Sequence, residues 1–254
     1  MLKILLERLR QGHRTIEWPQ GPPPELSDRF RGRPRLERTR CPAECQACVD
    51  ACSTGAIDLA GPGRIDLGRC LFCPDCAEAC PAGAIAFGPD HRLAVRQRGD
   101  LELAGTEELR LATALDHRLK RLFGRSLKLR QVSAGGCNAC EADINVLGTV
   151  GWDLGRFGIQ LVASPRHADG LLITGPVTQN MALALRKTWD AVPAPKLVIA
   201  VGACAISGGP FAGRPEQQDG VHDLPVDLYI PGCPPHPLTI LDGLLRLLGR
   251  LESN

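Results

Sequence analysis

Length, composition and charge set the first limits on this chain of 254 residues. Its 30 Lys and Arg against 28 Asp and Glu give a formal net charge of +2, which gives nucleic-acid binding no support. The length suits two domains or one large one. No run of 18 apolar residues occurs, so the sequence predicts no membrane-spanning helix. An N-terminus without the long apolar core of a signal peptide predicts a cytoplasmic protein.

The N-terminal residues are predicted to form a helix and an extended arm. Residues 1–12 place four leucines on one helical face: Leu2, Leu5, Leu6 and Leu9. This face either packs on the protein's own domain or a partner, or docks near a membrane-bound subunit. Residues 19–34 are too rich in proline for regular structure and need another surface to hold them. An arginine-dense run such as Arg29–Arg40 is usually a solvated tail, and binding to an acidic partner or a membrane surface is the alternative.

The chain has 12 cysteines, which are predicted to be metal ligands. Disulfides are rare in the reducing cytoplasm. Cysteines two residues apart also cannot all find disulfide partners without strain.

A cysteine pattern occurs twice between residues 41 and 87, each time followed by G-A-I. The second copy is C-x2-C-x2-C-x3-C-P, the pattern of bacterial two-cluster ferredoxins, in which the fourth cysteine binds the other cluster. One cluster is therefore expected to bind Cys41, Cys45, Cys48 and Cys80. The other is expected to bind Cys52, Cys70, Cys73 and Cys76.

The first copy departs from this pattern at two places. Three residues rather than two separate Cys41 from Cys45, and Ser53 stands where proline is usual. A longer first loop can still close on a cluster. The alternative is a pair of zinc sites, but zinc needs only tetrahedral closure and does not require the repeated crossing of the fourth cysteine. The spacing therefore favours iron-sulfur clusters.

Residues 106–123 are predicted to be a helix that sets the distance between two halves of the chain. Apolar residues follow helical spacing from Leu109 to Leu122, with Thr106 as the N-cap and Gly124 as the stop.

Short apolar runs alternate with helical stretches in the rest of the chain. The predicted strands are residues 127–132, 159–163, 171–174, 197–201 and 226–230. Helices are predicted over residues 181–190 and 238–248. This alternation is typical of a parallel sheet covered on both faces.

Four cysteines follow three of these strands: Cys137, Cys140, Cys204 and Cys233. Because the carboxyl ends of parallel strands meet at one edge, these cysteines are expected to form one iron-sulfur site there. Nearby glycines would allow close backbone approach and N–H donation toward the sulfurs: Gly135, Gly136, Gly202, Gly208, Gly209 and Gly232. A zinc site and four unrelated buried cysteines are the alternatives.

Residues 126–249 resemble the small subunit of nickel-iron hydrogenases. The resemblance is carried, in order, by S-L-K-L-R-Q-V-S-A-G-G-C-N-A-C-E-A-D, T-G-P-V-T-Q-N-M, V-G-A-C-A-I-S-G-G and P-G-C-P-P-H-P. These motifs are most similar to the energy-converting, membrane-associated group (group 4) that includes formate hydrogenlyase. They are also related to the complex I subunit that holds the terminal cluster, but complex I has adjacent cysteines where Cys137 and Cys140 are separated. Residues 1–95 resemble the eight-iron ferredoxin subunit of the same complexes, so the chain resembles a fusion of the two.

The resemblance implies that the cysteines of the second half hold the cluster nearest a nickel-iron centre on a separate large subunit. Asp143 stands where the family usually has glutamate, with Glu141 beside the cluster, and both are candidates for a proton relay or a partner contact. His236 stands where complex I has arginine. It is a candidate donor that tunes the cluster, with an ordinary exposed loop histidine as the alternative.

The expected organisation follows from these inferences. It comprises an N-terminal helix and arm (1–40), an α+β ferredoxin domain with two [4Fe-4S] clusters (41–95), a helical linker (96–125) and an α/β, flavodoxin-like, doubly wound domain with a parallel sheet (126–254).

The predicted function is that of the iron-sulfur electron-transfer subunit of an oxidoreductase, a membrane-associated hydrogenase complex, with three [4Fe-4S] clusters in series. Expected partners are the nickel-iron large subunit, membrane-arm subunits and an electron donor or acceptor protein at the ferredoxin domain. These partners would hold the chain on the cytoplasmic face of the membrane. The alternatives are a complex I-like, quinone- or ferredoxin-linked subunit without nickel chemistry, and a zinc-stabilised adaptor.

Overall fold

The C-terminal half of this computed structural model is built on a parallel sheet; the structure describes residues 2–42 and 44–251. The strands of the sheet are β6 (Leu127–Ser133), β7 (Ile159–Leu161), β8 (Gly170–Thr174), β9 (Leu197–Val201) and β10 (Leu228–Ile230). They lie in the order β7-β6-β8-β9-β10, and every neighbouring pair is parallel. This order is that of flavodoxin-like sheets, in which ligands bind beyond the carboxyl ends of the strands. The predicted flavodoxin-like fold is confirmed.

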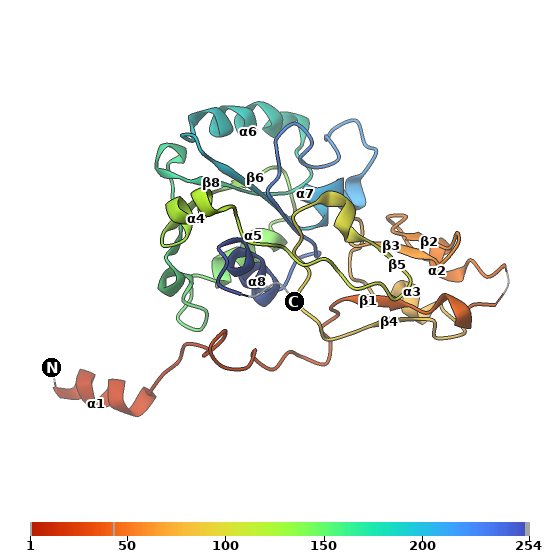
Figure 1. The fold of residues 1–254 in the computed structure, drawn as a ribbon, viewed down its shortest axis with the longest axis horizontal. Helices are drawn as coiled ribbons and strands as arrows, with labels where there is room; N and C mark the ends of the chain where they lie inside the picture. The colour runs from red at the N-terminus through yellow and green to blue at the C-terminus, as the bar shows by residue number, and fades with distance from the viewer. Residues whose placement is uncertain (1, 43, 252–254) are drawn as a thin grey trace.

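Helices cover both faces of this sheet (Figure 1). They are α5 (Ala139–Val146), α6 (Gln179–Ala191), α7 (Ala203–Ser207) and α8 (Pro237–Leu247). Leu171 and Ile173 of β8 pack into an apolar core that includes Leu185 of α6, whereas Leu172 packs into the core that contains α8. Every residue of β8 and β9 is buried, which is typical of a parallel sheet with both faces covered.

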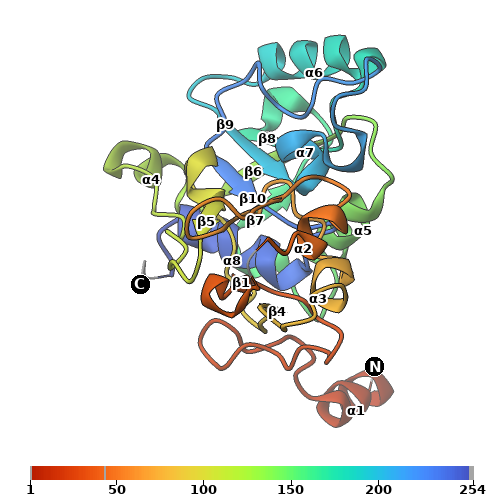
Figure 2. The ribbon, with the colours of Figure 1, turned by 90° about the vertical axis from the view of Figure 1, so that its right-hand side faces the viewer.

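The segment before the sheet forms a smaller unit of short antiparallel strands and short helices (Figure 2). β1 pairs with β4, and β3 lies between β2 and β5. The elements are β1 (Pro34–Leu36), α2 (Ala47–Asp50), β2 (Ile57–Asp58), β3 (Arg64–Asp66), α3 (Asp75–Glu78), β4 (Ile85–Phe87) and β5 (Glu102–Ala104). This mixture of strands and helices agrees with the predicted α+β ferredoxin unit.

One apolar core continues from the small unit into the sheet. It contains Phe72 of the small unit together with Val132 of β6 and Val198 of β9. Val95 also pairs with Tyr229 of β10 by two backbone hydrogen bonds of 3.0 and 2.9 Å. The two halves therefore share buried surface and backbone pairing.

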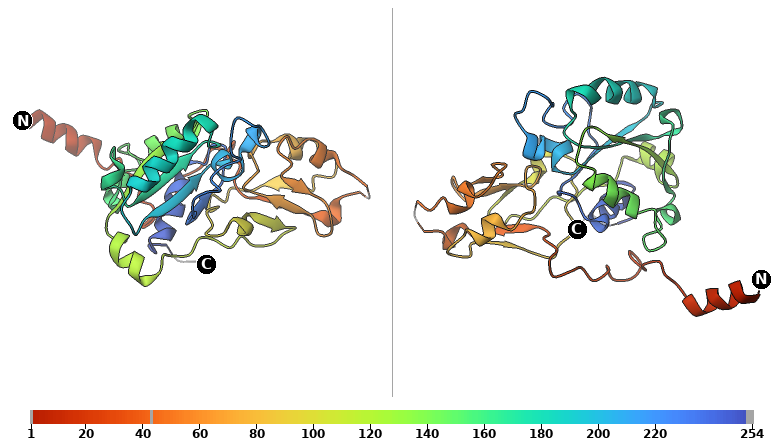
Figure 3. Two further views of the ribbon diagram at one scale, coloured as in Figure 1. Left: turned by 90° about the horizontal axis from the view of Figure 1, so that it is seen from above. Right: turned by 180° about the vertical axis from the view of Figure 1, so that it is seen from behind.

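The N-terminal arm runs along the sheet half before it enters the small unit (Figure 3). The N–H of Ile16 donates to the carbonyl of Gly151 at 2.9 Å. The Arg156 guanidinium donates to the carbonyls of Ile16 and Trp18, both at 2.7 Å. The Trp18 ring is buried. These contacts hold the residues just before the proline-rich stretch 19–34. Within the stretch, the N–H of Gly32 donates to the carbonyl of Gly88 at 2.8 Å, whereas several of residues 22–29 are exposed.

Helix α1 (Leu2–Gln11) projects away from the body of the protein (Figures 1 and 3). None of its residues is buried, and its four-leucine face is open: Leu2 71%, Leu5 60%, Leu6 57% and Leu9 79% exposed. The predicted helix is confirmed, and its apolar face is not packed on its own domain. No helix in the described part of the chain is long and apolar enough to cross a membrane.

The helix predicted for residues 106–123 is wrong over its first two thirds. Helix α4 covers only His117–Phe123, and its N-cap is Asp116 rather than Thr106. The preceding residues are irregular and are held by the body of the protein, as the N–H of Leu115 donates to the carbonyl of Leu247 at 2.9 Å. Their apolar residues are buried because the segment packs against the core, and not because they line one side of a helix.

Candidate metal centres

The cysteines of the small unit fall into two groups. The middle group is Cys52, Cys70, Cys73 and Cys76. Burial, and then the nearby thiols of Cys76, Cys52 and Cys73, raise the pKa of Cys70 to about 12. Burial and the same group's thiols also raise the pKa of Cys76 to about 11. The structure therefore brings Cys52 from the first copy together with three cysteines of the second.

The distal group is Cys41, Cys45, Cys48 and Cys80. Burial raises the pKa of Cys48, and the nearby thiols of Cys80 and Cys41 add to this rise. Cys45 is half-buried in the same loop, where its N–H donates to the carbonyl of Pro42 at 3.3 Å. The fourth cysteine of the second copy thus lies with the first copy, as the ferredoxin pattern predicts.

The repeated G-A-I motif has a role that the sequence did not suggest. The N–H of Ala56 donates to Cys52 Sγ at 3.3 Å, and the N–H of Ala84 donates to Cys80 Sγ at 3.2 Å. The glycines before these alanines, Gly55 and Gly83, have φ of +60° and +57°, a conformation that glycine adopts without strain. The motif therefore turns a peptide N–H toward the fourth sulfur of each copy.

The proximal group is Cys137, Cys140, Cys204 and Cys233. The first two lie between β6 and the start of α5, Cys204 lies in α7 after β9, and Cys233 follows β10. Burial, and then the nearby thiols of Cys233 and Cys137, raise the pKa of Cys204 to about 12. Burial, and then the nearby Cys204 thiol and Glu141 carboxylate, raise the pKa of Cys140, and Cys233 and Cys137 add to this rise. The predicted meeting of these loops at one sheet edge agrees with the structure.

Two glycines allow close approach of backbone to the proximal sulfurs. A Cβ added at Gly202 would lie 2.5 Å from Cys140 Sγ, and one at Gly209 would lie 3.0 Å from Cys204 Sγ. The other predicted glycines face other groups: Gly135 faces Thr178, Gly136 faces Gly175, Gly208 faces Asp219 and Ala212, and Gly232 faces Pro235. Gly209, rather than Gly208, is therefore the residue of that loop that borders a sulfur.

The donor sets suit iron-sulfur clusters. Each group supplies four thiols, and peptide N–H groups point at sulfurs, as in the bond from the N–H of Phe72 to Cys70 Sγ at 3.3 Å. Within the described residues, no three His, Cys, Asp or Glu side chains converge tightly enough to hold a single metal ion.

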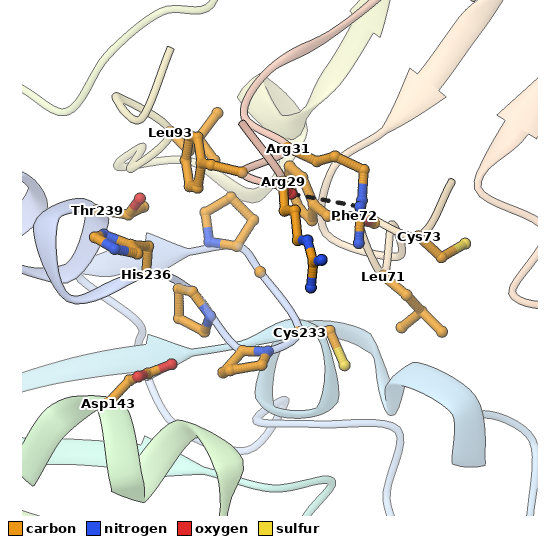
Figure 4. A pocket seen from close by; sticks show the side chains of 15 residues that line it. Arg29, Arg31, Leu71, Phe72, Cys73, Leu93, Asp143, Cys233, His236 and Thr239 are labelled. Atoms are coloured by element: carbon orange, nitrogen blue, oxygen red, sulfur yellow. Dashed lines mark hydrogen bonds between the residues drawn. The ribbon is translucent and has the colours of Figure 1, made fainter. Parts of the chain in front are cut away.

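A cavity of about 520 Å³ lies between the middle and proximal groups (Figure 4). Cys73 lines one side and Cys233 another. Partial desolvation raises the pKa of Cys233 although the residue is exposed, and the thiols of Cys137 and Cys73 add to the rise. The middle group also lies near the distal group, because the distal Cys48 thiol contributes to the raised pKa of Cys76 in the middle group. The order is therefore distal, middle, proximal.

The candidate acids differ in their surroundings. Glu141 is buried, and its Oε1 accepts a hydrogen bond of 2.5 Å from the Thr174 hydroxyl. Asp143 is half-buried and lines the cavity beside Cys233, where burial raises the pKa of its carboxyl. Only Asp143 therefore faces the open space near the proximal group.

His236 caps α8 and anchors the arm. Its Nδ1 accepts a hydrogen bond of 3.1 Å from the N–H of Leu238. Its ring lies edge-on to Phe30 of the arm, at 5.5 Å between ring centroids, and to Trp152, at 5.9 Å. Burial lowers the pKa of this imidazole. The alternative of an ordinary exposed loop histidine is wrong, because these contacts hold the ring in place.

Two family models match the chain. One, described as "NADH ubiquinone oxidoreductase, 20 Kd subunit", matches residues 137–247, and one described as "4Fe-4S dicluster domain" matches residues 40–84.

Similar curated proteins are named as subunits of a membrane-bound hydrogenase, a formate hydrogenlyase and an NADH-quinone oxidoreductase. The probable membrane-bound hydrogenase subunit mbhJ of Pyrococcus furiosus is 42% identical over 136 residues, which cover 53% of this chain and 81% of that protein. Formate hydrogenlyase subunit 7 of Escherichia coli is 44% identical over 136 residues, 53% of each protein. An NADH-quinone oxidoreductase subunit from Bacteroides thetaiotaomicron is 43% identical over 133 residues, 51% of this chain and 66% of that protein.

Proposed function

We propose a function for this chain, which belongs to the family of the 20 Kd subunit of NADH ubiquinone oxidoreductase. The chain passes electrons through three [4Fe-4S] clusters, to or from the nickel-iron site of a partner large subunit. The predicted resemblance, a subunit of this type with a ferredoxin-like N-terminal part, is confirmed. The predicted role as an electron-transfer subunit of a membrane-associated oxidoreductase complex is confirmed as well. The number of clusters, their ligands and the nickel-bearing partner belong to the proposal.

The observation that carries the proposal is the row of three cysteine groups. We assign one cluster to each group, with the ligands predicted from the sequence. Bound clusters would supply one-electron transfer, and the chain would hold them, limit their contact with water and set their potentials through N–H groups and nearby charges. The division into an N-terminal arm, a ferredoxin domain, a linker and a C-terminal domain is proposed with it. The predicted bounds at residues 40 and 95 are moved outward, because β1 and β5 pair with strands of the small unit, and the bound at 125 is kept.

The proximal group supports a partner at the sheet edge. Cys137 and Cys233 are exposed, whereas Cys204 is buried. A cluster bound there would be open on one side, which is the side where a large subunit would cover it. The C-x2-C spacing of Cys137 and Cys140 supports a hydrogenase-type partner over a complex I-type one. Asp143, in the adjacent cavity, is the proposed proton relay or partner contact, and Glu141 is its buried neighbour.

Anaerobic purification of the intact complex tests this function. The expected result is nickel in the complex, about twelve irons per copy of this chain, and dye reduction driven by hydrogen. Iron without nickel and without hydrogen oxidation would support the complex I-like alternative. Zinc in place of iron would overturn both.

The open face of α1 supports attachment to the membrane, and gives a prediction. Its cations, Lys3, Arg8 and Arg10, accompany the exposed leucines, a combination typical of helices that lie in the lipid interface. Replacing Leu9 with glutamate is expected to weaken binding to vesicles with anionic lipids at least tenfold, because it puts a charge on the apolar face. Flotation of the purified complex with vesicles measures this.

Gln11→Glu is the matched control, since it adds the same charge to the same helix away from the leucines. It is expected to weaken binding only slightly. Equal losses in both variants would show that charge, rather than the apolar face, decides attachment. Unchanged binding in Leu9→Glu would mean that other subunits alone hold the complex on the membrane.

A further inference from the structure

The arginine-dense run of the arm reaches the cavity between the middle and proximal groups. Arg29 and Arg31 line the same cavity as Cys73 and Cys233. Figure 4 shows both arginine side chains at this cavity, next to Phe72. Arg35 belongs to the same run but lines a different cavity, together with Ala86 and Arg92. Two cations of the arm are thus placed where two cysteine groups come nearest to each other.

Arg31 is bound directly to the loop that carries the middle group. Its Nε donates a hydrogen bond of 2.6 Å to the carbonyl of Phe72, the residue that precedes Cys73. Phe72 has φ of +54°, and its own N–H donates to Cys70 Sγ at 3.3 Å. The guanidinium is therefore fixed beside a peptide that lies between two of the middle cysteines.

Contacts of residues other than the arginines also hold the arm beside this cavity. The N–H of Gly32 donates to the carbonyl of Gly88 at 2.8 Å. A Cβ at Gly32 would overlap the carbonyl oxygen of Asp90, so the backbone is pressed against the small unit. The Phe30 ring rests on His236. Loss of one arginine charge is therefore expected to leave the arm in place.

In the described part of the chain, Arg29 and Arg31 are not paired with carboxylates. Among the described residues, no carboxylate forms an ion pair with Arg29 or Arg31. Of the described residues that line the cavity, Asp143 alone carries a carboxylate. Both side chains have access to solvent, so screening moderates their field without removing it.

We propose that Arg29 and Arg31 raise the reduction potential of the middle cluster, which lies at the junction of the two halves. The proposal rests on the function proposed above. A reduced cluster carries one more negative charge than an oxidised one, so a nearby cation stabilises the reduced form more. Arg31 has the larger effect, because its hydrogen bond to Phe72 holds it against the ligand loop. The two arginines act on the cluster through their positive charge, and they take no part in bond chemistry.

Redox titration of the anaerobically purified chain, followed by electron paramagnetic resonance, tests the proposal. Cys52→Ser and Cys45→Ser, which alter one ligand each, identify the signals of the middle and distal clusters. In Arg31→Gln, the ratio of reduced to oxidised middle cluster at a fixed potential is expected to fall about threefold, which is about 30 mV for a one-electron couple. The distal signal should not move. Arg29→Gln should give a smaller shift in the same direction.

Two controls separate charge from structure. Arg35→Gln removes the same charge from the same arm outside the cavity, and should leave the middle potential unchanged. Arg31→Lys keeps the charge, and should stay closer to the unmodified chain than Arg31→Gln does. High salt should reduce the shift, because it screens exposed charges.

The outcomes distinguish this inference from the function on which it rests. A chain without iron would refute the proposed function. Iron-replete variants in which Arg31→Gln leaves the middle potential unchanged would overturn the role of the arginines alone. An equal shift in Arg35→Gln, or in Arg31→Lys, would overturn it as well, since overall charge or the hydrogen bond would then be the cause.

Discussion

Replacing Cys140 with alanine is expected to remove about four of about twelve irons per chain, and with them the transfer of electrons to the partner. Cys140 lies at the start of α5, and burial raises the pKa of its thiol. Burial disfavours the thiolate form of Cys140, and a bound cluster would stabilise that form because its iron would bind the thiolate. Without Cys140, three thiols remain around the site, and a cube needs four ligands. Iron analysis and the resonance signals of the remaining clusters measure the loss.

Cys41→Ala is the matched control for this variant. It removes a thiol of the same type from the distal group, at the far end of the row. The same amount of iron should be lost, but hydrogen should still reduce the proximal cluster in the complex. Unchanged iron in Cys140→Ala, or loss of all iron from the chain, would contradict the assignment of one cluster to each group.

Gly202→Ala is expected to lose the proximal cluster although no ligand is changed. The added Cβ would lie 2.5 Å from Cys140 Sγ, a distance at which the sulfur or the β9–α7 turn must move. Gly202 also has φ of +89°, where alanine is strained. The iron content should fall as in Cys140→Ala, while the signals of the distal and middle clusters persist.

Gly213→Ala separates the two causes. Gly213 has φ of +75°, but a Cβ there would meet no atom within 4 Å. Its cost is therefore that of backbone strain, about 1–2 kcal/mol, which should lower the midpoint of thermal unfolding and leave the iron content unchanged. If both glycine variants lose the same iron, contact with the Cys140 sulfur is not the reason.

The sequence was sufficient to predict the sheet and the cysteine groups. The strands are short apolar runs that need burial on both faces, and their carboxyl ends meet at one edge whatever the details of packing. Cys204 and Cys233 could therefore be placed beside Cys137 without any knowledge of contacts. The crossing of Cys52 and Cys80 between groups followed from spacing in the same way.

Other features could not be predicted because they depend on long-range packing. The segment around Leu115 has helical spacing, but its backbone bonds to the body of the protein instead of to itself. The contacts of His236 with Phe30 and Trp152 join residues that are far apart in the chain. The N–H donors at Ala56 and Ala84 had a signal, the repeated G-A-I, but its meaning depends on the positive φ of the glycine before each.

The shared core between the small unit and the sheet bears on how this protein is made. Phe72 packs with residues of β6 and β9, and Val95 pairs with Tyr229 at the edge of the sheet. If the two halves were synthesised separately, each would carry an uncovered apolar surface and would have to find the other. A single polypeptide removes that assembly step and fixes their stoichiometry at one to one. Cells that make this chain therefore control both halves by one level of expression.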